Sequence, residues 1–307
     1  MAKSWSALLE GRVNGQTVGR WWLTLWLVGT LSGCAWLTDQ QRQIIYRPML
    51  TAHGSTVTSP SSVQFYELEV PRSGTPAHIS LWWLPQTDPQ APTLLYLHGT
   101  FRNLEGNQHK IESLRQAGFS ILALDYRGWG QSTAITPSEQ TILADARLAW
   151  AELVRREPRP AQRVIYGHSM GSGVAVDLAS QLSYPQDYGG LILESAFTSF
   201  ADVARSAGFW TRVLALFSTE RFASIDKIGQ VHAPLLMLHG QQDDTIPIAL
   251  GEQLFAAAHA PKQWVSIKAG GHSDLDLVAA DAYQHALQVF KTQHLVPAAL
   301  PTLQTQN

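Results

Sequence analysis

The chain has 307 residues, of which 45% are hydrophobic and 15% are charged, and its formal net charge at pH 7 is −2. This length suits one large domain, and the composition is that of a globular protein. The chain has no cluster of Lys and Arg, which argues against nucleic-acid binding, and its single cysteine excludes an internal disulfide and a cysteine-based metal site.

The first 33 residues have the layout of an export signal. A charged region that ends at Arg20 precedes an apolar run from Trp21 to Leu31, and small residues follow before Cys34. The letters LSGC at the end of this stretch resemble the lipobox of bacterial lipoproteins, which implies cleavage after residue 33 and lipidation of Cys34. The alternative is an uncleaved N-terminal anchor, although residues 21–37 are close to the shortest length that crosses a bilayer. Either way we expect a membrane-anchored, extracytoplasmic protein that faces the periplasm.

A polar tether is expected over residues 34–50, followed by the body of the protein over residues 51–293. Apolar and polar residues alternate in SVQFYELEV and again in AHISLWWLP, which is typical of half-buried strands. We therefore expect an antiparallel pair of strands at one edge of a sheet.

Six short and nearly continuous apolar runs follow: TLLYLHG, FSILALDYRG, RVIYGHS, GLILES, PLLMLHG and QWVSIKAGGH. Such runs are typical of parallel strands that are buried on both faces. Helical patterns lie between them, at Asn107 to Gln116, Pro137 to Arg156, Ser172 to Leu182, Ile248 to His259 and Leu277 to Phe290. The alternation predicts the α/β fold class, with a mostly parallel central sheet and helices on both faces.

About forty residues separate GLILES from PLLMLHG, where one crossover helix would suffice. In this insertion Val203, Trp210, Leu214 and Phe217 recur at helical spacing. We expect a small helical lid over residues 199–230 that lines an apolar substrate pocket. Plain packing onto the domain body is the alternative. The final stretch, 294–307, is expected to be a flexible tail.

The letters GHSMG, residues 167–171, match G-x-S-x-G between a predicted strand and a predicted helix. At such a sharp turn the serine adopts a strained backbone conformation, and its neighbours must be small to avoid clashes. The turn exposes Ser169 at the carboxyl end of the sheet, where open α/β sheets bind ligands. Ser169 is therefore the candidate nucleophile, and the neighbouring His168 is expected to point elsewhere.

A serine hydroxyl needs a base to take its proton and an acid to orient that base. In the chain order expected for this turn, Asp243 follows a late strand and His272 follows the last one. The pattern G-x-x-D-x-x-I-P at 240–247 selects Asp243 rather than Asp244, and Glu194 is the reserve acid. The sequence therefore predicts a catalytic triad of the serine, Asp243 and His272.

The tetrahedral intermediate of acyl transfer needs backbone N–H donors for its oxyanion. Met170 supplies one, and the loop after the first parallel strand supplies another, from Thr100 or from the runner-up Phe101. The histidines at the ends of other strands, His98 and His239, are expected to bond local backbone. The chain holds no H-E-x-x-H motif and no other His/Asp spacing of ligand type, so we expect no metal site.

These motifs occur in the order of the α/β-hydrolase superfamily: HG at 98–99, LALDYRGWGQS, GHSMG, LESAFTS, LHGQQDDTIP and GGH. With the leading IIYRP, the chain resembles the small-lidded serine hydrolases of the BEM46-like branch, over residues 44–290. The resemblance implies the triad of Ser169, Asp243 and His272 without a cofactor. One departure is HGTFRN, where many relatives have HGN-x-GN, so the shape of the oxyanion loop is less secure than the triad.

The sequence predicts a serine hydrolase that cleaves carboxylic ester or thioester bonds of a small-molecule acyl substrate through an acyl-enzyme. A serine peptidase is one alternative, and a non-catalytic binding protein that kept the fold is another. Cofactor-free haloperoxidase chemistry also stays open. A dehalogenase is excluded, because it would need a carboxylate at position 169.

Overall fold

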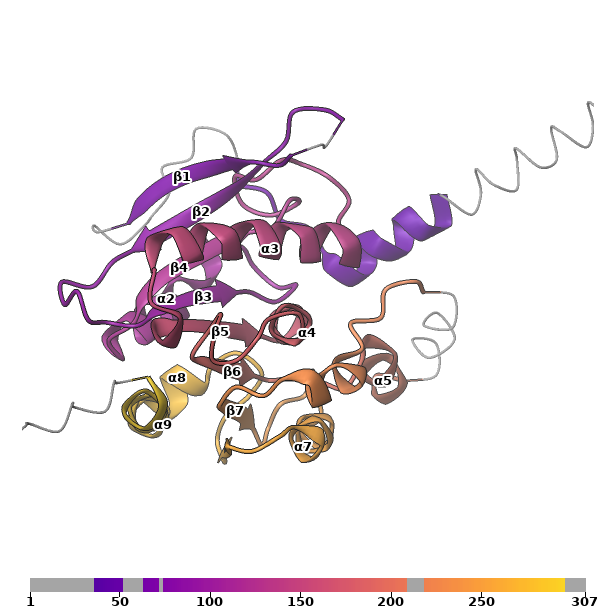
Figure 1. Cartoon of the computed structure of the whole chain (residues 1–307). Coiled ribbons are helices and arrows are strands. Elements are labelled where there is room, and N and C mark those ends of the chain that lie inside the picture. Colours follow the sequence, from indigo (N-terminus) through magenta and orange to yellow (C-terminus); the bar gives the residue numbers. More distant parts are fainter. Residues whose placement is uncertain (1–35, 52–62, 72–73, 209–217, 296–307) are drawn as a thin grey trace, which may run out of the picture.

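The computed structural model describes residues 36–51, 63–71, 74–208 and 218–295 of the chain. Within these ranges the strands form one eight-stranded sheet in the order β1-β2-β4-β3-β5-β6-β7-β8 (Figure 1). The β1–β2 and β2–β4 pairs are antiparallel, and all other neighbouring strands are parallel. The predicted α/β fold class is therefore confirmed.

Each predicted strand is present. The strands are β1 (Gln64–Glu69), β2 (His78–Leu84), β3 (Thr93–Leu97), β4 (Ser120–Asp125), β5 (Arg163–His168), β6 (Gly190–Glu194), β7 (Leu235–Gly240) and β8 (Lys262–Ile267). Every residue of β3 to β7 is buried, whereas β1 alternates between exposed and half-buried positions. Five of the six continuous apolar runs belong to strands with no solvent side, β3 to β7. The sixth, β8, is mostly half-buried instead, because it is the last strand of the sheet and has a neighbour on one side only. The alternating pattern of β1 belongs to the opposite edge of the sheet.

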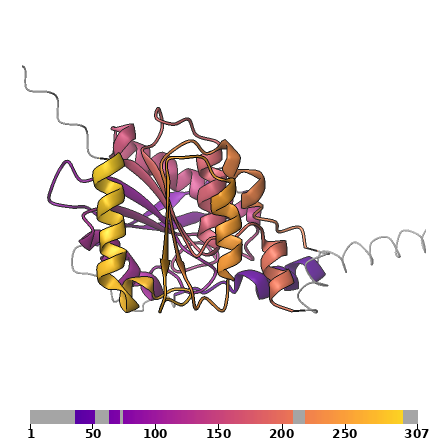
Figure 2. The ribbon, with the colours of Figure 1, turned by 90° about the horizontal axis from the view of Figure 1, so that it is seen from below.

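Helices cover both faces of the sheet. They are α2 (Gln108–Gln116), α3 (Glu139–Arg156), α4 (Met170–Ser180), α5 (Phe200–Ser206), α7 (Ile248–Ala257), α8 (Leu275–Val278) and α9 (Ala280–His294). Short 3₁₀ turns lie at Glu105–Asn107, Pro160–Gln162, Ser224–Asp226 and Ile228–Gln230. Buried side chains of α3, α4 and α7 join one apolar cluster, and those of α2 and α9 join another. Figure 2 shows yellow α9 and orange α7 on opposite sides of the sheet.

The helix expected from Leu277 to Phe290 begins earlier and is broken in two. The break falls at Ala279, whose φ of −144° and ψ of 50° do not continue a helix. The short α8 that precedes it buries Asp276, so the break lets this carboxylate enter the interior.

The expected tether over residues 34–50 is, from residue 36 onward, a packed part of the domain. Residues 36–46 form a helix, and Tyr46 at its end is fully buried. The Tyr46 ring packs edge-on against Trp129, with 6.3 Å between ring centres, and its hydroxyl donates to the carboxylate of Glu220. The packed body therefore includes this segment instead of beginning at residue 51, because a buried tyrosine attaches it to the core.

The two ends of the insertion expected to form a lid pack onto the domain. Phe200 and Phe222 lie 4.7 Å apart between ring centres, and Phe222 is buried. Three of the residues that define the predicted apolar face, Trp210, Leu214 and Phe217, lie outside the described residues. The lid over residues 199–230 stays a prediction.

The predicted signal over residues 1–33, Cys34 and the tail beyond Leu295 also lie outside the described residues. Leu295 itself is buried, and its carbonyl oxygen accepts a hydrogen bond from the Gln162 side chain. In the part of the chain that the structure describes, every helix is too short or too polar to cross a bilayer.

Candidate active site

Ser169 alone makes the turn between β5 and α4. Its φ of 54° and ψ of −125° lie in a region that L-residues rarely adopt. Two glycines make room for the turn: a Cβ at Gly167 would lie 2.2 Å from the carbonyl oxygen of Gly171, and a Cβ at Gly171 would lie 2.0 Å from that of Leu97. The strained strand-to-helix turn expected from GHSMG is therefore present, and it brings Ser169 to the carboxyl end of the sheet.

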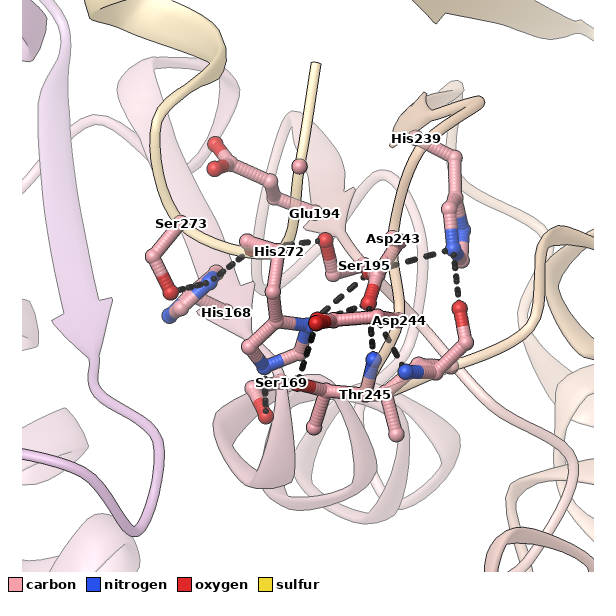
Figure 3. A network of polar contacts seen from close by, with 12 residues as sticks. His168, Ser169, Glu194, Ser195, His239, Asp243, Asp244, Thr245, His272 and Ser273 are labelled. Atoms are coloured by element: carbon pink, nitrogen blue, oxygen red, sulfur yellow. Dashed lines mark hydrogen bonds and ion pairs between the residues drawn. The ribbon is translucent and has the colours of Figure 1, made fainter. Parts of the chain in front are cut away.

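Three side chains that are far apart in the sequence meet at this turn (Figure 3). The Oγ atom of Ser169 lies 2.9 Å from Nε2 of His272, and Nδ1 of His272 lies 2.9 and 3.0 Å from the two carboxylate oxygens of Asp243. Because an ionised carboxylate only accepts, the proton of the neutral ring is on Nδ1. Nε2 is then the acceptor for the serine hydroxyl, which is the arrangement that proton transfer from Ser169 requires.

Asp243 is the carboxylate that meets the ring, and Asp244 is not. The Asp243 side chain is fully buried, while Asp244 is exposed. Burial raises the pKa of Asp243, but hydrogen bonds from His239, from His272 and from the backbone N–H of Ile246 outweigh it and lower the pKa below its usual range. Asp243 is therefore ionised at neutral pH and can stabilise positive charge on the ring.

The loop after β3 runs directly past the nucleophile. A Cβ at Gly99 would lie 2.9 Å from Cβ of Ser169, so only a glycine allows this approach. The backbone N–H groups of Thr100 and Met170 donate to no partner within the described residues, and neither does that of Phe101. Donors on both sides of Ser169 are thus available to an oxyanion.

Arg102 occupies a backbone position that favours glycine. In HGTFRN this residue stands at the position of the second glycine in the pattern HGN-x-GN, and its φ is +70°. A side chain in this conformation costs on the order of 1 kcal/mol. A Cβ at Gly106 would lie 2.6 Å from Cβ of Arg102, so Gly106 leaves the room that Arg102 needs. The loop keeps its left-handed turn although the glycine is absent.

Two side chains to which the sequence assigned no role in the site, His168 and Ser195, hold the backbone of the His272 loop. Nε2 of His168 lies 2.9 Å from the carbonyl oxygen of His272, and Oγ of Ser195 donates to the same oxygen at 3.0 Å. Burial lowers the pKa of His168 to about 4, so its ring is neutral at pH 7 and donates from Nε2. His168 points away from the serine hydroxyl, as expected, but its ring bonds the backbone of His272, the residue that contacts that hydroxyl.

Glu194, the reserve acid, belongs to a different cluster. Its carboxylate points away from His272 (Figure 3), lies 2.7 Å from Nζ of Lys110, and accepts hydrogen bonds from the hydroxyls of Tyr166 and Tyr283. Burial raises the pKa of Glu194, but the charge of Lys110 outweighs it and lowers the pKa to about 2. Lys110 also forms an ion pair with Asp276. Glu194 is therefore ionised and committed to the interior.

The remaining histidines at strand ends bond local backbone, as predicted. Nδ1 of His98 lies 2.6 Å from the carbonyl oxygen of Gly99, and Nε2 of His239 lies 3.0 Å from that of Ile246. His98 thereby fixes the start of the loop that passes Ser169, and His239 fixes the turn that carries Asp243.

Residues 88–223 match the family described as "Serine aminopeptidase, S33". The chain is 32% identical over 206 residues to alpha/beta hydrolase domain-containing protein 17B of Xenopus tropicalis, covering 66% of this chain and 67% of that protein. The chain belongs to the α/β-hydrolase superfamily. The superfamily assignment of the sequence motifs is therefore confirmed.

The chain is also similar to three further proteins. An uncharacterized protein of Mycobacterium tuberculosis is 32% identical over 260 residues, which cover 84% of this chain and 89% of that protein. The lysophosphatidylserine lipase ABHD12 of Danio rerio is 32% identical over 199 residues, and the chain spans about half of its length, 51%. The esterase Pf2001 of Pyrococcus furiosus shares the fold, with a TM-score of 0.61 and 17% identity over 76% of this chain and 94% of that one.

Proposed function

We propose that the protein is a serine hydrolase that cleaves carboxylic ester or thioester bonds through an acyl-enzyme. The observation that carries the proposal is the convergence of Ser169, His272 and Asp243, from three different loops, at hydrogen-bond distances of 2.9 Å. A weakly nucleophilic hydroxyl becomes reactive when a base is within reach and a carboxylate orients that base.

In the first half-reaction Nε2 of His272 takes the hydroxyl proton while Oγ of Ser169 attacks the carbonyl carbon of the substrate. The ionised Asp243 stabilises the imidazolium that forms. The backbone N–H groups of Met170 and Thr100 donate to the carbonyl oxygen as it becomes an oxyanion. The bond to the alcohol or thiol then breaks, and His272 returns its proton to that leaving group.

In the second half-reaction a water molecule replaces the leaving group. His272 takes a proton from the water, whose oxygen attacks the carbonyl carbon of the acyl-enzyme. When the bond to Oγ breaks, the proton returns to Ser169, and the carboxylic acid leaves. The same base and the same oxyanion donors therefore serve both steps.

Ester cleavage is the reaction that the named relatives support. ABHD12 is a lysophosphatidylserine lipase and Pf2001 is an esterase. The finer assignment to the BEM46-like branch depends on sequence letters such as IIYRP, and we retain it as a proposal.

A serine aminopeptidase is the second candidate. The description of the matched family favours it, and the matched residues 88–223 contain Ser169 but neither Asp243 nor His272. The same triad would attack an amide carbon, with His272 giving its proton to the leaving amine. Activity on an ester and on an aminoacyl anilide separates the two candidates.

We further propose that the protein is anchored to a membrane on its extracytoplasmic side, through lipidated Cys34 or through the uncleaved apolar run from Trp21 to Leu31. Replacement of Cys34 by Ser would abolish lipidation. Mass spectrometry of the membrane fraction should find the processed, lipidated N-terminus only in the unchanged chain, whereas an unprocessed chain in both would support the uncleaved anchor.

The reaction is tested with p-nitrophenyl butyrate and with alanine p-nitroanilide, using the full chain and its Ser169→Ala variant. We expect ester hydrolysis by the unchanged chain and a loss of about 10⁶-fold in turnover in the variant, with a folded circular dichroism spectrum in both. Anilide cleavage that exceeds ester cleavage would favour the aminopeptidase. Equal rates in chain and variant would contradict catalysis by Ser169 and favour a non-catalytic protein.

A further inference from the structure

The helix over residues 36–46 turns apolar side chains toward solvent. Trp36, Leu37 and Ile44 are 64%, 57% and 66% exposed. Helices of globular proteins usually bury such residues against the core, and this helix is attached through Tyr46 instead. Its apolar outer surface therefore has no function in holding the domain together.

The exposed positions form one surface. Successive residues of a helix are rotated by about 100° about its axis. By this rotation, the five exposed residues of the helix fall within about a third of its circumference. This outer arc consists of Trp36, Leu37, Gln40, Gln43 and Ile44, all of them exposed, while the other positions of the helix are half-buried or buried. The outer arc holds no acidic residue, so a surface rich in phosphate would meet no repulsion from it.

The C-terminal end of the helix that carries the outer arc leads to the loop beside the candidate active site. Arg47 follows the helix directly, and its guanidinium lies 4.9 Å from the centre of the Phe101 ring. Phe101 is 58% exposed and follows Thr100, the proposed oxyanion donor. Figure 1 shows the indigo helix next to one end of α3, the end at which Glu139 donates its backbone N–H to Glu220.

Two arginines at this site have no carboxylate partner among the described residues. They are Arg47, whose guanidinium lies over the exposed Phe101 ring, and Arg102, which follows Phe101 in the sequence. Other arginines of the same region do have partners: Arg42 pairs with Glu220, and Arg127 pairs with Asp145. Two positive charges without a carboxylate partner therefore lie beside the loop that passes the nucleophile.

The sequence before the helix limits its distance from any membrane anchor. The apolar run from Trp21 to Leu31 ends five residues before Trp36, and Cys34 is two residues away from it. A fully extended chain spans at most about 3.6 Å per residue, so residue 36 lies within about 18 Å of the end of the run. Either mode of attachment brings the outer arc to the bilayer surface.

We propose that the outer arc, together with Arg47, Arg102 and Phe101, docks on the surface of a phospholipid bilayer and holds the active-site entrance against it. Trp, Leu and Ile side chains enter the boundary between headgroups and acyl chains, and the guanidinium groups meet the phosphates. The whole chain carries a formal charge of only −2, so these local features, not the net charge, direct the contact. An acyl ester in the bilayer could then reach Ser169 without first entering bulk water, a consequence that rests on the proposed function.

The docking is tested with a fluorophore on the full chain, reconstituted into phosphatidylcholine vesicles that contain phosphatidylglycerol. Cys34→Ser removes the native thiol, and the apolar run from Trp21 to Leu31 of the full chain then serves as the attachment to the bilayer. Ile44→Cys carries an environment-sensitive label on the outer arc. Gln116→Cys is the matched control, because Gln116 is exposed, ends α2 and lies four residues before the start of β4. It is therefore on the side where the parallel strands begin, whereas Ser169 is on the side where they end. With brominated lipids, the label at 44 should lose most of its fluorescence and the label at 116 should keep it.

If brominated lipids quench the labels at positions 44 and 116 to the same extent, the docking is overturned. The body would then lie away from the bilayer, or another part of the chain would cover the outer arc. A second measurement compares the unchanged chain with Trp36→Gln/Leu37→Gln/Ile44→Gln. The variant should lose about tenfold or more in activity on a monoacyl ester in vesicles and retain its activity on p-nitrophenyl butyrate. A parallel loss on both substrates would contradict docking, whereas inactivity of the unchanged chain on both would contradict only the proposed function.

Discussion

Asp243 follows strand β7, and Glu194 ends the neighbouring strand β6, yet the two carboxylates have different partners. Asp243 is buried beside His272 and bonds its ring. Glu194 is equally buried, but the ammonium of Lys110 lies 2.7 Å away and two tyrosine hydroxyls complete its hydrogen bonds. The position of a carboxylate at the carboxyl end of a strand therefore does not assign its role. The role depends on which side chain, His272 or Lys110, lies against the carboxylate.

The comparison also separates two kinds of stability. The ion pair of Lys110 and Glu194 joins α2 to β6 inside the molecule, and Asp276 from α8 lies against the same ammonium. The contacts of Asp243 instead orient a ring that is partly exposed. We expect changes in the first cluster to affect folding and changes in the second to affect turnover.

Neutralising each carboxylate in turn tests this difference with the largest expected effect. Asp243→Asn should lower turnover on p-nitrophenyl butyrate by about 10⁴-fold, because an amide neither stabilises the imidazolium nor fixes the required tautomer. Its free energy of unfolding, measured with urea, should change less than its turnover.

Glu194→Gln is the matched control for that change. It should lower the free energy of unfolding by about 3 kcal/mol, because Lys110 loses one of its buried partners, and it should change turnover by less than about tenfold. The distinction fails if Glu194→Gln is as inactive as Asp243→Asn while its stability is unchanged.

A smaller effect is expected from Gly99→Ala. The added Cβ would lie 2.9 Å from Cβ of Ser169, so the loop or the nucleophile must move. Such a displacement should cost about 10²-fold in turnover, measured with the same ester. Gly229→Ala is the control, since nothing lies within 4 Å of a Cβ there. Full activity of Gly99→Ala would show that the loop does not constrain the site.

The smallest effect concerns pH and His168. Burial lowers the pKa of His168 from 6.5 to about 4. As the pH falls from about 6.5 to about 4, the unfolded chain takes up a proton that folded His168 does not, so stability is lost across this window. Between pH 7 and pH 5 the loss should be about 2 kcal/mol.

His168→Gln keeps a side-chain donor but removes this titration. Urea unfolding at pH 7 and at pH 5 should therefore show a smaller loss of stability for the variant than for the unchanged chain, by about 2 kcal/mol. Identical losses in both proteins would mean that His168 does not titrate in this window.

The fold was predictable because its strands have distinctive patterns. Strands buried on both faces, such as β3 and β5, appear as continuous apolar runs, and the alternating β1 marks the sheet edge. The helix over residues 36–46 was not predictable in the same way. Its polar composition suggested a tether, but the burial of Tyr46 and the ion pair of Arg42 with Glu220 attach it to residues more than eighty positions away.

The residues of the candidate site that come directly after strands were predictable from the sequence. Ser169, Asp243 and His272 each follow a strand, so their meeting follows from the topology of a parallel sheet. The supports of the His272 backbone were not predictable, because hydrogen bonds from His168 and Ser195 to one carbonyl oxygen leave no pattern in the sequence.

The central claim is that Ser169 is a nucleophile activated by His272, and covalent labelling tests it most directly. The full chain and its His272→Ala variant are incubated with a fluorophosphonate, digested and analysed by mass spectrometry. We predict one adduct per chain on the peptide that contains Ser169, and a rate of labelling that is strongly reduced in the variant. Absence of the adduct, its location on another residue, or equal labelling rates would contradict the account.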